Sequence, residues 1–507
     1  MLKITLHSVI QLLQEESLLK LIIRQGHYYY DLPNDYQFNH VSFNSKETHP
    51  NTLFFCKGAK FKAEYLLEAL NKGCLFYISE KPYGEHHQHR DAINLLVTDV
   101  YKAMANIAQE FYGNPQKALK TIAFTGTKGK TTSAYFTKKL LDEDYPANKV
   151  AMFTTMQNTT DGIHYSKSLN STYEALDLYR MMWEAVNNGC QYLVMEASSH
   201  GYKMNRLYNL TFDVGVFLNI SPDHIGPVEH PDFEDYLYHK LLLIQHSKQM
   251  VFNKDMELSN LLTSVCDFYQ VSYTTFSSFN QDADYVLNKG SQNTFSIEDR
   301  VHNHTEEDLS ISLLGEFNQM NALAAIAAIH TLEPMTPLTH KKALADVLVP
   351  GRMESIKVDE GKTIYIDYAH NYLSLLNLIQ LVKEKHPQAR LSLVIGSTGN
   401  KAESRRKDFG QLIDQYINHA YVTSDDPDFE NPKEIADEII SYVSDPDKTS
   451  IIIDRQVAIE TAIENMQNQE VLLLAGKGAD TFQKIQGKHK TYLGDGIIAR
   501  NYLQQDH

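Results

Sequence analysis

Residues 125–132, Thr-Gly-Thr-Lys-Gly-Lys-Thr-Thr, combine the residue types that bind phosphate. They follow the apolar run 122–124 and precede a segment with a helical pattern. A glycine turn between a strand and a helix presents backbone N–H groups at the positive end of the helix dipole. Lys130 can neutralise the outer phosphates, and the Thr131 hydroxyl can bind magnesium. The general phosphate-loop pattern also needs a glycine where this chain has Phe124, so the alternative is a turn that binds nothing. The strand–loop–helix setting favours a nucleoside triphosphate site.

Glu196 is the second residue placed for chemistry, because it ends the predicted buried strand 192–195. A carboxylate at the C-terminal edge of a parallel strand, in the same domain as a phosphate loop, is well placed to hold magnesium. The alternative is a helix-capping cluster, since Ser198 and Ser199 are good N-cap residues. The phosphate loop upstream favours the metal site.

Asp223 and His224 follow another predicted strand, 214–218. Together with His230 they could form a zinc site, but zinc requires three or four ligands, and no cysteine or glutamate has a convincing spacing. A position around the nucleotide or its magnesium ion is the simpler interpretation. Lys240 lies in a predicted amphipathic helix downstream, where spacing alone predicts a solvent-exposed side chain.

The last third of the chain has polar residues at four predicted strand ends. These ends are residues 367–370, 396–401, 423–428 and 475–480. Open α/β sheets bind ligands at such edges, so we predict a substrate pocket there. Asp425, Asp426 and Asp428 place three carboxylates close together, which is unfavourable unless they face a cation. Their alternative is a capping turn ahead of a helix. Arg405 and Arg406 can steady a phosphate or carboxylate group.

The elements that carry these residues alternate between short β-branched or aromatic runs and longer helical patterns, which is typical of parallel α/β layers. Turns at 113–115 and 350–351 divide the chain, and we predict three domains, residues 1–117, 118–348 and 349–507. The third has the doubly wound pattern of a Rossmann-like sheet. The other predicted elements are helices 133–141 and 318–330 and strands 52–55, 74–78, 250–253, 363–366, 391–395, 419–423 and 471–474.

Composition narrows the class of protein. The formal net charge of −16 argues against a protein that binds nucleic acid or acidic membranes. No apolar window is long enough to span a bilayer, and residues 1–13 resemble the start of an amphipathic helix rather than a signal peptide. The four cysteines lack metal-like spacing, so we expect reduced, buried thiols in a soluble cytoplasmic protein. His86, His87 and His89 are expected in a solvated loop rather than a metal site.

In order and spacing, these motifs resemble those of the Mur ligase family, most closely its tripeptide-synthetase branch, over essentially the whole chain. The family's phosphate loop does not need the glycine that the general pattern has at the position of Phe124, so its absence here fits the family. So many matches in sequence order are highly specific. The matching motifs are Gly126–Thr132, Glu196-x-Ser-Ser-His200, Asn219-x-x-x-Asp223-His224, Gly315-x-Phe317-Asn318-x-x-Asn321, Pro350-Gly-Arg352-x-Glu354 and Asp367-Tyr-Ala-His370.

The resemblance implies a UDP-binding domain, a central ATPase domain and a C-terminal Rossmann-like domain, with ATP and Mg²⁺ as cofactors and a monomeric, cytoplasmic enzyme of peptidoglycan synthesis. ATP would phosphorylate the free side-chain carboxylate of D-glutamate in UDP-MurNAc-L-Ala-D-Glu. The amine of a diamino acid would then attack the acyl phosphate and release phosphate. A carboxylate is a poor electrophile until its oxygen becomes a good leaving group, and the transfer needs its charge neutralised.

The resemblance also implies roles for individual residues. The lysine at position 240 is carbamylated in this family and helps to hold magnesium, which overturns the exposed position expected from spacing. The implied catalytic residues are Lys130, Glu196, His224 and Lys240, and the implied metal ligands are Thr131, Glu196 and carbamylated Lys240. The implied ATP-binding residues are Gly126, Thr127, Lys128, Gly129, Lys130, Thr131, Thr132, Asn318, Arg352, Asp367 and His370. The implied UDP-MurNAc-dipeptide residues are Ser45, Lys46, Ser171, Thr172, Ser198 and Arg206.

The amino acid to be added is implied by one motif. Enzymes that add meso-diaminopimelate have Asp-Asn-Pro-Arg, whose arginine binds the second carboxylate, whereas this chain has Asp-Asp-Pro-Asp at 425–428. An acidic pocket suits a bare ammonium and therefore L-lysine, and it would repel a carboxylate at a cost of several kcal/mol. L-ornithine stays open, because one methylene is worth only about 1–3 kcal/mol. The implied amino-acid-binding residues are Asp425, Asp426, Pro427, Asp428, Lys477, Asp480 and Arg405.

Two departures and two rival functions remain open. Met204 stands where many relatives have glutamine, and Tyr173 replaces a frequent proline. Folylpolyglutamate synthase shares the phosphate loop and the ligation chemistry but lacks the Asp-Asp-Pro-Asp element. A non-catalytic nucleotide-binding regulator would bind ATP without amino-acid-dependent release of phosphate.

Overall fold

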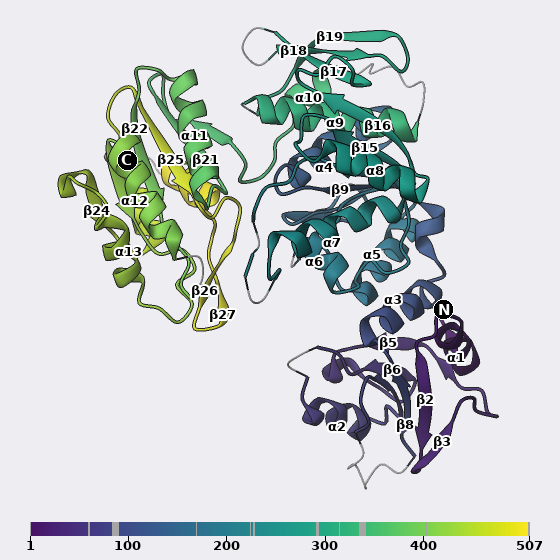
Figure 1. Cartoon of the computed structure of the whole chain (residues 1–507). Helices are drawn as coiled ribbons and strands as arrows, with labels where there is room; N and C mark the ends of the chain where they lie inside the picture. Colours follow the sequence, from purple (N-terminus) through teal and green to yellow (C-terminus); the bar gives the residue numbers. More distant parts are fainter. Residues whose placement is uncertain are drawn as a thin grey trace. The chain divides into compact units, whose positions relative to one another are not determined.

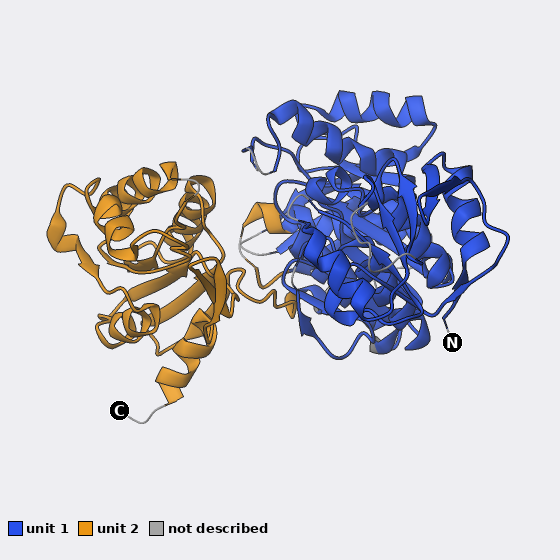
Figure 2. Ribbon diagram, turned by 90° about the horizontal axis from the view of Figure 1, so that it is seen from below, with its two compact units in different colours: residues 1–310, 319–344 blue, residues 311–318, 345–507 orange. Residues whose placement is uncertain are grey.

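The computed structural model describes residues 2–58, 61–83, 91–168, 170–223, 225–226, 229–290, 294–313, 315–333, 341–400 and 403–504. Its contacts divide the chain into two compact units. Unit 1 comprises residues 1–310 and 319–344, and unit 2 comprises residues 311–318 and 345–507 (Figure 2).

Unit 1 begins with a six-stranded sheet of order β3-β2-β8-β7-β6-β5 (Figure 1). Strands β5 to β8 run parallel, and β2 pairs antiparallel with β8. The three strands β6 to β8 are buried along their whole length, as is typical of strands covered on both faces. The elements are β1 (Ile4–Thr5), α1 (Leu6–Glu15), β2 (Leu19–Arg24), β3 (His27–Tyr29), β4 (Gln37–Phe38), β5 (His40–Ser42), β6 (Thr52–Phe55), α2 (Ala63–Asn71), β7 (Phe76–Ser79), β8 (Ile93–Val97) and α3 (Val100–Phe111).

The rest of unit 1 is built on an eleven-stranded sheet of order β12-β11-β10-β13-β9-β14-β15-β16-β17-β18-β19. In this order, adjacent strands from β10 to β17 are parallel, and antiparallel strands extend the sheet at both ends. The strands are β9 (Lys120–Thr125), β10 (Val150–Phe153), β11 (Gln157–Thr159), β12 (Ser166–Lys167), β13 (Tyr192–Glu196), β14 (Phe212–Phe217), β15 (Ser247–Asn253), β16 (Ser272–Ser277), β17 (Tyr285–Lys289), β18 (Thr294–Asp299) and β19 (His304–Ser310). The helices are α4 (Lys130–Asp144), α5 (Ala175–Asn187), α6 (Ser199–Lys203), α7 (Phe233–Gln245), α8 (Ser259–Tyr269), α9 (Glu316–Leu332) and α10 (Lys341–Ala345).

The carboxyl ends of three central strands of this sheet meet at one edge. Strand β9 lies between β13 and β14, with Glu196 opposite Phe124 and Phe217 opposite Thr125. The segments that follow these strands therefore begin side by side. This arrangement places the phosphate loop between the two other polar strand ends that the sequence singles out.

Unit 2 contains a six-stranded sheet of order β20-β21-β25-β22-β23-β24, parallel except for β20. A separate hairpin, β26 and β27, precedes the last helix. The strands are β20 (Glu354–Lys357), β21 (Lys362–Asp367), β22 (Arg390–Ile395), β23 (His419–Val422), β24 (Thr449–Ile451), β25 (Glu470–Ala475), β26 (Phe482–Ile485) and β27 (Lys488–Thr491). The helices are α11 (Tyr372–Lys385), α12 (Ser404–Tyr416), α13 (Pro432–Ile440), α14 (Arg455–Glu464) and α15 (Asp495–Gln504).

The predicted α/β class is confirmed, and every predicted strand is present, with ends that differ by at most three residues. The predicted helix 133–141 begins earlier, at Lys130, and the predicted amphipathic helix at the N-terminus begins only at Leu6, where the Thr5 side chain caps it. The four cysteines are free and buried, as predicted. The three domain boundaries stay a prediction, and the histidines at 86–89 lie outside the described residues. No helix in the described part is long and apolar enough to cross a membrane.

Candidate active site

The phosphate loop connects β9 to α4 and has an uncapped helix start. Gly129 is the N-cap residue of α4, and no side chain accepts a hydrogen bond there. Its φ of +87° is strained for other residues, and an added Cβ would collide with the Asn321 side chain from α9. Position 129 therefore requires glycine for both its backbone conformation and its close contact with Asn321. The start of α4 has no side-chain cap, and an uncapped helix N-terminus is suited to binding an anion.

The loop is held by the segment that follows β14. Asn219 Oδ1 accepts from the Lys128 N–H at 2.9 Å, and the Asn219 amide donates to the Lys128 carbonyl at 3.1 Å. The Thr127 hydroxyl donates to the Ser221 carbonyl at 3.2 Å and accepts from the Ser221 N–H at 3.0 Å. Lys128 also pairs with Asp223 at 3.5 Å. The Asn219–Asp223 cluster therefore braces the loop, which agrees with the predicted position around the nucleotide.

Glu196 joins the loop to the neighbouring strand ends. Its carboxylate is 1% exposed and accepts from the Thr131 hydroxyl at 2.7 Å. Thr155, which follows β10, donates its N–H and its hydroxyl to the two carboxylate oxygens at 2.8 and 2.9 Å. Thr131 and Glu196, two of the predicted magnesium ligands, therefore lie in direct contact, and their role as ligands stays a prediction. A buried carboxylate beside a threonine hydroxyl is an all-oxygen donor set, which Mg²⁺ prefers.

Lys240 lies under the loop rather than in solvent. The residue is 2% exposed, and its Nζ donates to the Gly126 carbonyl at 2.8 Å. Lys130 Nζ donates to the same carbonyl at 2.8 Å. Burial, followed by the nearby Lys130 charge, holds the pKa of Lys240 well below its ordinary value. The exposed position expected from spacing is wrong, and the lowered pKa favours the neutral amine that carbamylation requires.

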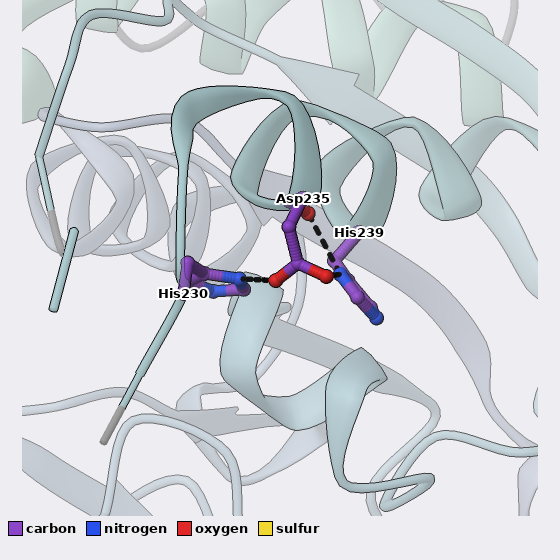
Figure 3. Close-up of side chains that lie close together, drawn as sticks. All are labelled: His230, Asp235 and His239. Atoms are coloured by element: carbon purple, nitrogen blue, oxygen red, sulfur yellow. Dashed lines mark hydrogen bonds and ion pairs between the residues drawn. The ribbon is translucent and has the colours of Figure 1, made fainter. Parts of the chain in front are cut away.

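A polar cluster on the start of α7 lies next to this lysine. Asp235 accepts from Lys203 Nζ at 2.8 Å and lies 2.7 Å from His230 Nδ1, with His239 on its other side (Figure 3). His230 Nε2 contacts the Ser199 hydroxyl at 3.0 Å. Since both ring nitrogens of His230 are already bound, the zinc site weighed for Asp223, His224 and His230 gains no support. His224 lies outside the described residues, so its role stays a prediction.

Four of the six residues predicted for the UDP-MurNAc-dipeptide lie around Glu196. The Thr172 hydroxyl donates to the Glu196 carbonyl at 3.1 Å and accepts from the Ser198 N–H at 3.1 Å. Arg206 donates to the Thr172 carbonyl at 2.9 Å and pairs with Glu174 at 2.8 Å. The Ser171 and Thr155 hydroxyl oxygens lie 2.8 Å apart, within hydrogen-bond distance. Met204, the position of the missing glutamine, ends α6 beside this group.

The other two predicted residues lie in the N-terminal sheet region of unit 1. Ser45 is buried and donates its hydroxyl to Glu68 at 2.6 Å, whereas Lys46 is exposed. They are not brought together with the phosphate loop. Their role at a uracil–ribose site stays a prediction.

Four predicted ATP-binding residues belong to unit 2. The Arg352 guanidinium lies 4.9 Å from the centre of the Tyr368 ring. Asp367 accepts from the Met353 N–H at 2.8 Å, and His370 Nδ1 contacts the Tyr368 carbonyl at 2.8 Å. These residues therefore gather at the carboxyl end of β21. The fourth, Asn318, is buried in the first turn of α9.

The predicted carboxylates of unit 2 face cations that the chain itself supplies. We call Asp425, Asp426, Asp428 and Asp480 the acidic cluster. Lys477, 1% exposed, pairs with Asp426 at 2.9 Å and with Asp425 and Asp480 at 3.7 Å each. Lys484 from β26 pairs with Asp428 at 2.6 Å. Burial lowers the pKa of Lys477, but its aspartates outweigh burial and raise it, whereas burial raises the pKa of Asp425.

A cavity of about 520 Å³ opens beside the acidic cluster and is lined by Asp428, Ser424, Phe429, Arg455 and Tyr492. Its volume is within the usual range for a small-molecule site. Pro427 lies against Gly399, whose N–H donates to the Asp426 carbonyl at 2.9 Å.

The two arginines predicted to steady an anion lie on α12 and differ in their surroundings. Arg406 is buried and pairs with Glu430 and Glu438 at 2.7 Å each, so it braces the fold rather than a ligand. Arg405 is half-buried, and its role stays a prediction.

Sequence reasoning missed Thr155, the Asp235 cluster and Lys484, and it named Lys477 without its ion pairs. Thr155 could have been found by the signal that found Glu196, since it lies just after a buried apolar strand, β10. The pairs of Lys477 with Asp426 and of Lys484 with Asp428 had no such signal, because these partners are about 50 residues apart in the chain.

Comparison with known sequences gives a consistent result. The profile of the Mur ligase middle domain matches residues 124–329, and that of the Mur ligase glutamate ligase domain matches residues 351–478. A protein of Streptococcus pneumoniae named UDP-N-acetylmuramoyl-L-alanyl-D-glutamate–L-lysine ligase is 44% identical over 502 residues, covering 99% of this chain and 100% of its own. The protein of the same name from Streptococcus agalactiae is 42% identical over 505 residues, with the same coverage.

Solved structures show the same fold. A UDP-N-acetylmuramoyl-L-alanyl-D-glutamate–2,6-diaminopimelate ligase is 25% identical, with a TM-score of 0.61 over 93% of this chain and 96% of its own. The MurF ligase of Thermotoga maritima, solved in complex with ADP, is 18% identical, with a TM-score of 0.59 over 92% of this chain and 98% of its own. Because the MurF ligase is only 18% identical, its similarity shows the fold alone.

Proposed function

The chain belongs to the Mur ligase family, and we propose that it joins L-lysine to the D-glutamyl side-chain carboxylate of UDP-MurNAc-L-Ala-D-Glu with conversion of ATP to ADP and phosphate. The relatives that carry the name of this reaction match the chain over its full length. One structural observation supports the proposed phosphoryl transfer most directly. Lys130, Thr131, Glu196 and Lys240 converge at the carboxyl edge of one sheet.

The reaction has two steps that these residues suit. The D-glutamyl carboxylate attacks the terminal phosphorus of ATP, so that an acyl phosphate forms and ADP leaves. The lysine amine then attacks the acyl carbon, the C–N bond forms, the C–O bond to phosphate breaks, and the amine loses a proton. Lys130 can leave the Gly126 carbonyl and turn its charge to the transferred phosphoryl group. The N–H groups at the start of α4 would hold the other phosphates.

Mg²⁺ fits the oxygen donors of this site. Thr131, Glu196 and a carbamylated Lys240 would hold it, and it would neutralise the phosphate charge that develops in the transfer. The neutral Lys240 amine can take up CO₂, and the resulting carboxylate would replace a poor magnesium ligand with a good one.

The acyl donor, UDP-MurNAc-L-Ala-D-Glu, and the amino acid are assigned to two further groups of residues. Ser171, Thr172, Ser198 and Arg206, which surround Glu196, are proposed to bind the dipeptide. The acidic cluster is proposed to bind the side-chain ammonium of L-lysine. Its four carboxylates exceed its two lysines, so a cationic side chain is favoured and a second carboxylate is not.

The proposal is tested by measuring phosphate release and product mass with the purified chain. Release is expected only when ATP, Mg²⁺, UDP-MurNAc-L-Ala-D-Glu and L-lysine are all present. Lys130→Met is expected to lower kcat roughly 100-fold or more, since it removes a charge that acts on the transferring group. Lys139→Met is the matched control, because Lys139 lies on the same helix, is exposed and pairs only with Glu143 in the described part.

Each alternative has its own outcome. Equal turnover with meso-diaminopimelate would refute the choice of lysine, and faster turnover with L-ornithine would replace it. ATP binding without phosphate release for any diamino acid would favour a nucleotide-binding regulator. An equal loss in Lys130→Met and Lys139→Met would show that the loss is not due to charge at the phosphate site.

A further inference from the structure

A second group of metal-binding side chains lies away from the phosphate loop, where the antiparallel end of the large sheet meets α9. Asp299 is the last residue of β18 and lies opposite Tyr285, the first residue of β17. His302 is in the turn between β18 and β19, and His330 comes from the last turns of α9. Strands β17 to β19 and α9 are labelled near one another in Figure 1. Three separate elements therefore send polar side chains to one point.

The donor atoms converge on one carboxylate oxygen. Asp299 Oδ2 lies 2.8 Å from His302 Nδ1 and 3.3 Å from His330 Nδ1. The Tyr285 hydroxyl lies 3.2 Å from the same His330 nitrogen. The other Asp299 oxygen accepts from the His302 N–H at 3.0 Å, which fixes the carboxylate in place. Two imidazole nitrogens and one carboxylate oxygen thus lie within 4.8 Å of one another.

The charge at this point is not balanced by a lysine or arginine among the described residues. Asp299 is 3% exposed, and its ion-pair partners are the two histidines. Arg300, its neighbour in the chain, pairs instead with Glu298. A carboxylate buried this deeply is costly to ionise unless a cation compensates its charge.

His330 supplies an independent sign that the hydrogen bonds alone are incomplete. The side chain is 7% exposed, and its Nε2 is buried without a hydrogen-bond partner. A buried ring nitrogen left unpaired is unfavourable. The two contacts of the other ring nitrogen, Nδ1, are both longer than 3.1 Å, so the ring is held only by long contacts on the side that faces Asp299.

We propose that Asp299, His302 and His330 form a site for a divalent transition-metal ion of the Zn²⁺ type, with the Tyr285 hydroxyl or a water molecule as fourth ligand. Two imidazoles and one carboxylate are a set that Zn²⁺ binds with four-coordinate geometry, whereas Mg²⁺ and Ca²⁺ prefer oxygen alone. The bound ion would neutralise Asp299 and fasten the antiparallel strands to α9. The first turns of the same helix carry Asn318 and Asn321, so the ion would also anchor the helix that reaches the phosphate loop.

The other His–Asp group, at His230, Asp235 and His239, lacks these properties. The Lys203 ammonium already lies 2.8 Å from Asp235 Oδ2 and neutralises it. His230 is bound through both nitrogens, and His239 Nδ1 contacts the Asp235 carbonyl at 2.7 Å. A metal ion would have to displace a cation and several hydrogen bonds there. This group is therefore the internal control for the proposed site.

The experiment titrates Co²⁺ into chelator-treated, full-length protein and records visible absorption, because tetrahedral Co²⁺ absorbs far more strongly than octahedral Co²⁺ at an all-oxygen magnesium site. One equivalent of Co²⁺ is expected to give the tetrahedral spectrum, and Zn²⁺ is expected to displace it. The variant His302→Gln is expected to weaken binding at least about 10-fold. His302 is 30% exposed by side chain, so this variant is expected to fold.

Three further measurements make the test decisive. Asp299→Asn is expected to abolish the tetrahedral spectrum, and the control variant His239→Gln is expected to leave it unchanged. Zn²⁺ is expected to raise the thermal midpoint of the wild type but not that of His302→Gln. The proposal is overturned if the wild type gives no tetrahedral spectrum. It is also overturned if His302→Gln binds as tightly as the wild type, or if His239→Gln removes the spectrum instead.

Discussion

Replacing Lys477 with methionine tests the electrostatics of the acidic cluster most directly. Lys477 is 1% exposed, and it faces Asp425, Asp426 and Asp480 at 2.9 to 3.7 Å. Methionine fills a similar volume but leaves these carboxylates without their shared cation. Removing one partner of a buried ion pair lowers the free energy of unfolding by about 3–5 kcal/mol. Because Asp426 and Asp480 are partly exposed, we expect a loss of about 3 kcal/mol.

The magnitude translates into a measurable shift of the thermal midpoint. Unit 2 has about 170 residues, and for a domain of that size 1 kcal/mol corresponds to roughly 2–4 °C. Differential scanning calorimetry is therefore expected to show unit 2 of Lys477→Met unfolding about 6–12 °C below the wild type. Amide hydrogen exchange in β25, which precedes Lys477, would assign the change to unit 2. Lys433→Met is the matched control, since its exposed pair with Asp437 is expected to contribute less than about 1 kcal/mol.

The pH dependence separates a charge effect from a packing effect. Burial raises the pKa of Asp425 and Lys477 opposes that rise, so the pKa of Asp425 rises further in Lys477→Met. When folding raises the pKa of a carboxyl group, the folded protein binds that proton more tightly than the unfolded chain does. The free energy of unfolding therefore falls as the pH increases through the folded-state pKa. The difference between the wild type and Lys477→Met should therefore be larger at about pH 8 than at about pH 5. A loss no larger than in Lys433→Met, or one independent of pH, would refute the reasoning.

Three further predictions concern activity. Asp428→Arg places a second cation beside Lys484 and is expected to raise KM for L-lysine about 10-fold or more. An unchanged KM would show that Asp428 does not bind the side-chain ammonium of L-lysine. Glu196→Gln keeps the shape of the side chain but removes its charge, and kcat is expected to fall about 100-fold with little change in thermal midpoint. The lowered pKa of Lys240 favours the neutral amine, so wild-type protein in ¹³C-bicarbonate should give a carbamate signal by NMR. Lys240→Arg, whose guanidinium stays protonated, should not give this signal. Full activity after removal of CO₂ would contradict the carbamate.

The sequence was sufficient to locate the main strands and the phosphate loop, because both have local signatures. Glu196 was found in the same way, as a carboxylate directly after a buried apolar run. The order of strands could not be found, since the neighbours of β9 are β13 and β14, which lie about 70 and 90 residues further along the chain. Their pairing depends on long-range packing, which no local pattern encodes.

Lys240 shows the limit of helical spacing as a guide to burial. The pattern of α7 predicts an exposed lysine, yet Nζ is buried against the Gly126 carbonyl of the loop. The Gly126 carbonyl accepts hydrogen bonds from both Lys130 and Lys240. The burial of Lys240 therefore follows from a tertiary contact. Only the resemblance to a known family predicted it, because a family pattern contains tertiary information that spacing lacks.

We propose that the choice of L-lysine depends on the difference between the negative and positive charges of the acidic cluster. Its four aspartates were predicted to bind the substrate, but Lys477 and Lys484 already neutralise part of their charge. The two cations differ in a way that bears on function, since Lys477 is buried whereas Lys484 is 41% exposed by side chain. Lys477 therefore stabilises the fold of the cluster, and Lys484 can be displaced from Asp428 by an incoming ammonium at little cost. An incoming carboxylate would meet a cluster in which four carboxylates outnumber two lysines, so the arrangement that suits lysine disfavours diaminopimelate.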